Sequence, residues 1–183
     1  MHHFNDETIT EKYISHERVF DGILLHINHA IYELPNGKPA RREIAVHVGA
    51  AAVLPIDDEG NVYLVRQFRA PLDKVLLEIP AGKLDHAGED RLEAAKRELA
   101  EETGLEADDW RFLTDTYNAA GYSSECISLY LARGLRAGES HPDEDEFLNL
   151  VKMPFDEAYD MVMRGEIRDA KTQITLLMAK NLI

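Results

Sequence analysis

Cysteine is almost absent from this chain, which contains only Cys126 among its 183 residues. One cysteine cannot form an intramolecular disulfide, so the sequence favours a reducing compartment. Cys126 begins an apolar run, and we interpret it as a small packed residue rather than a nucleophile. The chain also lacks an apolar run of membrane-spanning length and a signal-peptide pattern. We therefore expect a cytoplasmic protein without a membrane span.

Basic residues are scarce relative to acidic ones. The 20 lysines and arginines face 34 aspartates and glutamates, which gives a formal net charge of −14. Such an excess of negative charge argues against nonspecific binding to nucleic acid or to anionic membranes. Hydrophobic residues make up 45% of the chain and suffice for the core of one main domain.

The order of apolar segments predicts a mixed α/β or α+β domain, in which strands are interrupted by one central helix and followed by two more. A turn at 35–38 joins two strands into a hairpin. We expect strands at 19–20, 23–27, 30–34, 41–47, 50–55, 62–68, 110–117, 127–132 and 147–151, and helices at 89–103, 155–164 and 170–181. The residues expected to face the core from the last two helices are Phe155, Tyr159, Val162 and Met163, then Ile174, Leu177 and Met178.

The central helix carries an unusual concentration of carboxylates. Residues three and four apart are neighbours on a helix, so Glu98 stands beside Glu101 and Glu102. Like charges at this spacing repel by about 0.2–0.5 kcal/mol per pair. A cluster of this kind can supply oxygen ligands to a divalent cation, but Glu-rich helices are more often simply solvated.

The apolar stripe of the same helix helps to separate these alternatives. Leu92, Ala95 and Leu99 have the spacing of a buried face, and Glu102 falls at the edge of that stripe. A carboxylate there would be partly desolvated and would need a positive partner. Gly104, directly after the helix, is expected to end it in the left-handed conformation.

The residues around this helix resemble the Nudix box. The box has a glycine, a spaced glutamate, and then Arg-Glu-apolar-X-Glu-Glu-X-Gly-apolar, and here it runs from Gly82 through Glu89 to Leu105. The spacing from Glu89 to Arg97 matches the family. The segment from Lys83 to Gly88 is one residue longer than is usual, which we interpret as a longer loop.

Further segments resemble the ADP-ribose and nucleoside diphosphate-sugar pyrophosphatase subgroup of this family. They are residues 65–69 (Val-Arg-Gln-Phe-Arg), residues 77–82 (Leu-Glu-Ile-Pro-Ala-Gly) and the acidic loop 142–146. The resemblance implies a Nudix α/β/α sandwich over residues 47–183, preceded by an N-terminal β-sheet extension over residues 1–46. In the subgroup this extension often forms a homodimer, although it could also be an extra sheet on a monomer.

The same resemblance implies Mg²⁺ as cofactor, with Mn²⁺ as the other candidate. It assigns the metal ligands to the Ala81 carbonyl, Glu98, Glu101 and Glu102. Glu89 and Arg97 would orient the ligand helix. Arg69 would contact the substrate diphosphate through its guanidinium fork, and Glu78 is also assigned to substrate binding. The alternative for Arg69 is a surface salt bridge.

The general base is expected to come from the acidic loop. Glu146, directly before Phe147, matches best, Glu144 is the second candidate, and Glu101 is also counted among the catalytic carboxylates. The alternative is that the loop is only solvated.

The substrate implied is a small nucleotide sugar such as ADP-ribose, cleaved at its diphosphate to a nucleoside monophosphate and a sugar phosphate. Ala120 stands where ADP-ribose-preferring members commonly have proline, so strict ADP-ribose specificity is not implied. A GDP-mannose specialist and a non-catalytic ADP-ribose-binding regulator are the alternatives. The intact box argues against the regulator.

Overall fold

The computed structural model describes residues 6–138 and 148–183, which form a mixed α+β fold as predicted. In chain order the elements are β1 (Lys12–Asp21), β2 (His26–Glu33), β3 (Pro39–Val46), β4 (Ala50–Pro55), β5 (Asn61–Arg69), the 3₁₀ helix η1 (Ala70–Leu72), β6 (Lys74–Glu78), β7 (Ala81–Lys83), α1 (Arg91–Thr103), β8 (Leu105–Thr116), β9 (Ile127–Ala137), β10 (Asn149–Pro154), α2 (Phe155–Met163) and α3 (Ala170–Ala179). None of the helices among these described residues is long and apolar enough to cross a membrane.

The chain divides into two compact units. The first, here called the N-terminal unit, comprises the described residues up to 47 together with 119–125. The second, here called the main unit, comprises 48–118 and the described residues from 126 onward.

The N-terminal unit is an antiparallel sheet in the order β1-β2-β3. The predicted hairpin turn joins β2 to β3, where Gly37 has a positive φ of 79°. The strand predicted at 23–27 is wrong over its first half, because the Gly22 N–H donates to the Leu25 carbonyl and turns the chain there. Strand β2 therefore begins only at His26.

This unit has almost no interior of its own. Among its described residues only Asn28 and Ala30 are buried, and every residue of β1 is exposed. The exposed side chains include the large apolar groups of Tyr13, Ile14 and Phe20. Small sheets usually need a packing partner for their apolar face.

The main unit contains two sheets. One has the order β7-β4-β9-β8, with β4 and β9 parallel and the other pairs antiparallel. The other is antiparallel in the order β10-β5-β6. Strand β4 is buried along its whole length, as its continuous apolar run predicts.

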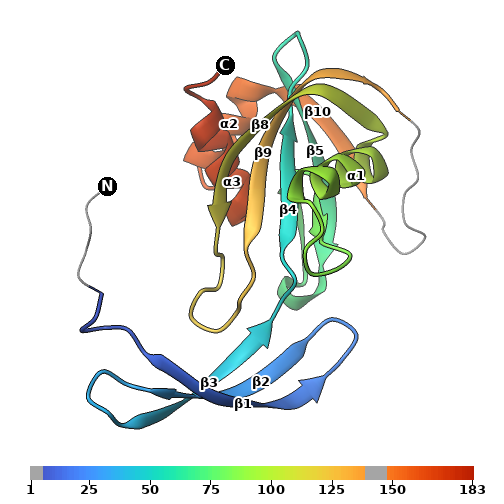
Figure 1. The fold of residues 1–183 in the computed structure, drawn as a ribbon. Coiled ribbons are helices and arrows are strands. Elements are labelled where there is room, and N and C mark those ends of the chain that lie inside the picture. Colours follow the sequence, from blue (N-terminus) through green and yellow to red (C-terminus); the bar gives the residue numbers. More distant parts are fainter. Residues whose placement is uncertain (1–5, 139–147) are drawn as a thin grey trace. The chain divides into compact units, whose positions relative to one another are not determined.

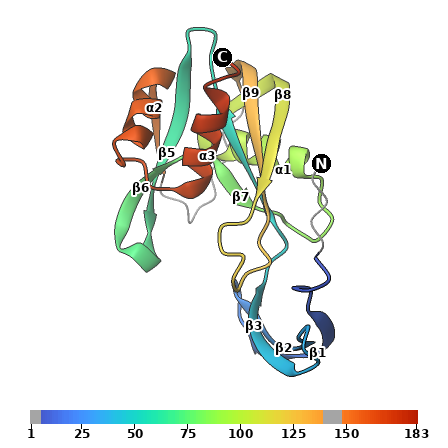
Figure 2. The same ribbon diagram turned by 90° about the vertical axis from the view of Figure 1, so that its left-hand side faces the viewer.

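Side chains alternate across β4, and this divides the core of the main unit into two clusters. Ala51 and Val53 pack with Ala95 and Leu99 of α1 on one face. Leu54, on the other face, packs with residues of β5, α2 and α3. Figure 1 shows α1 on one side of the strands and α2 with α3 on the other, and Figure 2 shows α3 in front of the strands with α1 behind them. This is the predicted α/β/α arrangement.

The ends of α1 are set by two specific residues. The Asp90 carboxylate accepts hydrogen bonds from the Leu92 and Glu93 N–H groups, so the helix starts at Arg91 rather than at 89. At the other end Gly104 adopts the left-handed conformation and its N–H donates to the Ala100 carbonyl, which confirms the predicted terminator.

The predicted core faces of the last two helices are partly wrong. Met163, Leu177 and Met178 are exposed. In α3 the buried face is built instead around Leu176, with Thr172 and Thr175 beside it. Threonines can be buried here because their hydroxyls are satisfied: Thr172 Oγ1 accepts from the Ile79 N–H, and Thr175 Oγ1 donates to the Lys171 carbonyl.

Candidate active site

The candidate site begins where α1 crosses β7. Glu98 is buried, and its carboxylate lies against Gly82. A β-carbon added at position 82 would overlap the atoms of this carboxylate. Any larger residue at this position would therefore have to displace the Glu98 carboxylate.

Glu102, one helical turn after Glu98, contacts the same strand, β7. Its Oε2 accepts a hydrogen bond of 3.0 Å from the Ala81 N–H. The structure thus brings together two of the predicted metal ligands, Ala81 and Glu102, although they are 21 positions apart in the sequence. Of the helix glutamates, Glu98 rather than Glu102 is the more deeply buried.

Arg97 offsets the charge of the neighbouring carboxylates. Its Nη1 donates to Glu98 Oε1 at 2.7 Å and to Glu101 Oε2 at 3.0 Å. Burial lowers the pKa of Arg97, but the negative charges of Glu98 and Glu101 raise it by a larger amount. The pKa of Arg97 therefore lies above its usual value. The cation therefore explains how this helix accommodates adjacent glutamates.

The same arginine also connects the helix to the preceding loop. Arg97 Nη2 donates to the Lys83 carbonyl at 3.2 Å, and its Nε lies 3.7 Å from Glu89 Oε1. Glu89 Oε2 accepts from the Asp85 N–H at 2.6 Å. Glu89 and Arg97 thus link the segment before α1 to the helix.

Arg69 and Glu78 form a second cluster, between β5 and β6. The guanidinium donates from Nε and Nη2 to the two oxygens of Glu78, each at 2.7 Å. The Glu78 side chain is only 2% exposed, whereas that of Arg69 is 38% exposed. Arg69 is therefore in an ion pair with a buried partner rather than in a purely superficial one.

Lys171 and Asp169 complete this cluster and were not identified from the sequence. Lys171 Nζ donates to Glu78 Oε2 and, at 3.0 Å, to Asp169 Oδ1. Asp169 also accepts from the Thr172 N–H and hydroxyl, which caps α3. A lysine in an otherwise buried helix face is the only sequence signal that could have indicated this pair.

Charge balance sets the ionisation of Glu78. Burial raises the pKa of this carboxyl, but the hydrogen bond from Arg69 and the charge of Lys171 lower it by more. The resulting pKa lies below the usual value, so Glu78 is ionised at neutral pH.

The donor groups around α1 fit a hard divalent cation in their chemistry. Glu98, Glu101 and Glu102 offer carboxylate oxygens next to the backbone of Ala81. In the arrangement seen over residues 6–138 and 148–183, no three acidic, histidine or cysteine side chains converge as a metal cluster. Glu98 and Glu101 face Arg97 instead, and Glu102 faces the Ala81 N–H. Glu144 and Glu146, the predicted bases, lie outside the described residues.

Known proteins resemble this chain over most of its length. The profile of the NUDIX domain matches residues 46–175. The methanol dehydrogenase activator of Bacillus methanolicus is 42% identical over 168 residues, covering 91% of this chain and 90% of the relative. The ADP-ribose pyrophosphatase of Bacillus subtilis (strain 168) is 40% identical over 168 residues, with 91% and 90% covered. A solved structure titled as an ADP compounds hydrolase has a TM-score of 0.81 at 25% identity, covering 94% of this chain and 93% of that one.

Proposed function

The chain belongs to the NUDIX domain family, and from this membership we propose that it hydrolyses the diphosphate bond of nucleoside diphosphate sugars such as ADP-ribose. The products are a nucleoside monophosphate and a sugar phosphate. One observation carries the proposal: the box residues Gly82, Arg97, Glu98 and Glu102 assemble around the Ala81 backbone, in a chain 40% identical to an ADP-ribose pyrophosphatase.

Members of this family generally depend on a divalent metal ion. We propose Mg²⁺, with Mn²⁺ as the alternative, held by Glu98, Glu101, Glu102 and the Ala81 carbonyl. When bound, such an ion supplies positive charge to the phosphates and lowers the pKa of a coordinated water. The chain's own contribution is to present the three carboxylates from α1 and the carbonyl from β7. Arg97 links the two elements through its contacts with Glu98, Glu101 and the Lys83 carbonyl.

Arg69 is the proposed contact to the substrate diphosphate. Its two bonds to Glu78 use Nε and Nη2, and the side chain remains partly exposed. Glu78 and Lys171 thereby fix the plane of the guanidinium, and Nη1 can meet a phosphate oxygen. Glu78 thus supports substrate binding by orienting Arg69.

The proton from the attacking water must go to a carboxylate of the chain. Glu146, Glu144 and Glu101 remain the candidates. Glu101 has the disadvantage that Arg97 already occupies its Oε2, which favours the loop glutamates.

The test is release of nucleoside monophosphate by the purified full chain with Mg²⁺, over a panel that contains ADP-ribose, other ADP-sugars and GDP-mannose. We expect turnover of at least one member and its loss when the ion is chelated. Turnover of GDP-mannose alone would favour the specialist alternative. If none of the substrates is cleaved with either Mg²⁺ or Mn²⁺, the proposed activity is wrong.

A second candidate rests on the relative named as a methanol dehydrogenase activator. By this likeness the chain would stimulate a dehydrogenase, which corresponds to the regulator alternative in the sequence analysis. To distinguish a hydrolase from a non-catalytic regulator, the wild-type chain and its Glu102→Gln variant are each added to a dehydrogenase assay, and the rate of the dehydrogenase is measured. Stimulation that survives the substitution would indicate a non-catalytic regulator.

We also propose that β1 to β3 form the contact of a homodimer, acting in the cytoplasm. The nearly coreless sheet and its exposed Tyr13, Ile14 and Phe20 support this proposal. Sedimentation of the wild type and of an Ile14→Asp variant tests it. We expect a dimer for the wild type and a monomer for the variant, and a monomeric wild type would exclude the homodimer.

A further inference from the structure

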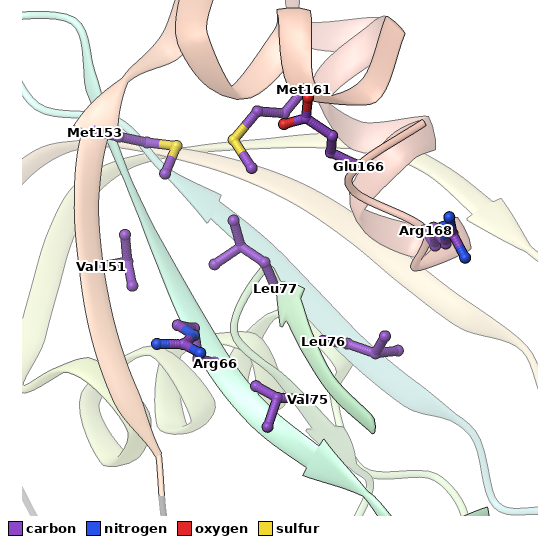
Figure 3. Close-up of a pocket in the computed structure, with 9 residues that line it drawn as sticks. All are labelled: Arg66, Val75, Leu76, Leu77, Val151, Met153, Met161, Glu166 and Arg168. Atoms are coloured by element: carbon purple, nitrogen blue, oxygen red, sulfur yellow. The ribbon is translucent and has the colours of Figure 1, made fainter. Parts of the chain in front are cut away.

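A pocket lies on the sheet β10-β5-β6, apart from the contacts of the candidate active site. Its volume is about 320 Å³, and its apolar lining comes from Val75, Leu76 and Leu77 of β6, Val151 and Met153 of β10, and Met161 of α2. Figure 3 shows Leu77 and the two methionine side chains directed into the same space. We call the space lined by these six residues the methionine pocket.

The methionine pocket is distinct from the clusters of the candidate active site. Leu77 lines the pocket, whereas its neighbour Glu78 is directed to Arg69 and Lys171. Among the residues that the structure describes, none of those assigned to the metal or to the diphosphate lines this pocket.

Two arginines border the apolar surface. Arg66 projects from β5, and Arg168 comes from the segment between α2 and α3 (Figure 3). Within the part of the chain that the structure describes, the side chain of Arg66 makes no hydrogen bond or ion pair. Among the described residues, the Arg168 side chain makes one hydrogen bond, from Nε to the Gly165 carbonyl at 3.1 Å.

The acidic residue of the pocket does not neutralise these arginines. Glu166 is engaged by Arg164, which donates to its two oxygens at 2.6 and 3.2 Å. In a chain of net charge −14, two guanidinium groups without an acidic partner among the described residues therefore face one apolar hollow.

This combination defines the chemistry of a ligand. An apolar floor favours a ring or a short aliphatic body, and a guanidinium group binds carboxylate, sulfonate or phosphate oxygens through paired N–H groups. The volume lies at the lower end of the range for small-molecule sites. We propose that the methionine pocket is a second ligand site, which binds a small organic anion with an apolar body.

The two pocket methionines provide a direct test on the full chain. With methyl-¹³C methionine, the protein is titrated with 8-anilinonaphthalene-1-sulfonate, an aromatic sulfonate. We expect the Met153 and Met161 methyl signals to shift together and to saturate. Met163 and Met178, which do not line the pocket, are expected to remain in place and serve as internal controls.

A charge variant tests the role of the arginines. We expect Arg66→Gln combined with Arg168→Gln to weaken binding of this probe at the pocket about tenfold or more, while the Met163 and Met178 signals show an intact fold. Arg111→Gln is the matched control, because it removes a positive charge from β8 that neither lines the pocket nor contacts Glu166. The proposal is overturned if Met153 and Met161 do not respond, or if the control weakens binding as much as the double variant. Neither readout depends on hydrolysis. The proposed second site is therefore tested independently of the proposed function.

Discussion

Gly82 and the Glu98 carboxylate are in such close contact that position 82 has no room for a β-carbon. A residue with a β-carbon at position 82 would have to push the Glu98 carboxylate out of its place. The preference for glycine at this position in the box is therefore steric and arises in the tertiary structure.

Gly82→Ala should therefore displace Glu98 and with it the proposed metal ligands. We expect turnover to fall about 100-fold or more, with a loss of about 1–3 kcal/mol in the free energy of unfolding from overpacking. Steady-state kinetics and urea unfolding measure the two effects. Gly121→Ala is the control, since nothing lies within 4 Å of the β-carbon it would add. Wild-type turnover in Gly82→Ala would contradict the steric argument.

Glu102→Gln should remove the proposed metal ligand while keeping the shape of the side chain. We expect turnover to drop by orders of magnitude and the unfolding midpoint to change little. The matched control is Glu93→Gln on the same helix, where the carboxylate is exposed and paired with Lys96. Similar rates in both variants would indicate that the helix glutamates are only a solvated face.

Lys171→Met tests the buried cluster around Glu78. Removing one partner of a buried ion pair destabilises by on the order of 3 kcal/mol, because the remaining charge is left poorly compensated. Lys96→Met, in an exposed pair, should change stability by less than about 1 kcal/mol. If Lys171 helps to orient Arg69, KM should rise in Lys171→Met more than kcat falls. Equal effects of the two substitutions on stability would show that burial of the pair has no consequence.

The depressed pKa of Glu78 predicts a pH dependence of stability. The folded-state pKa lies below the ordinary value of 4.5, so the ionised carboxylate stabilises the fold fully above that value. This contribution is lost as the pH falls through 4.5 toward the lower folded-state pKa. Urea unfolding from neutral to acidic pH should show a steeper acid loss for the wild type than for Glu78→Gln. The same dependence of the unfolding free energy on pH in both proteins would mean that the fold does not lower the pKa of Glu78.

The base can be assigned by replacing Glu146, Glu144 and Glu101 with glutamine one at a time. The variant that lacks the base should lose kcat by about 10²–10⁴-fold with little change in KM. Unchanged rates in both Glu146→Gln and Glu144→Gln would remove the acidic loop from the chemistry.

The sequence predicted best what depends on local pattern. The helix of residues 91–103, its terminator Gly104 and the buried strand β4 follow from spacing and apolar runs. The apolar segment around Ile23 was assigned to a strand because composition cannot distinguish a strand from an exposed apolar turn. Strands β6 and β7 were missed because they are short and adjoin Pro80 and Gly82.

Contacts between residues far apart in the sequence were harder to predict. Lys171 and Glu78 are 93 positions apart, and no periodicity links them. The core face of α3 was misjudged for a related reason. Buried threonines at 172 and 175 depend on hydrogen-bond partners that only the folded chain supplies.

The sparse interior of the sheet β1-β2-β3 also has a consequence for experiments. If a second copy of the chain covers its apolar face, the stability of this sheet depends on protein concentration. Dilution then destabilises the sheet, and a higher concentration stabilises it. Hydrogen exchange of the β1 amides would then vary with protein concentration, while that of the fully buried β4 would not.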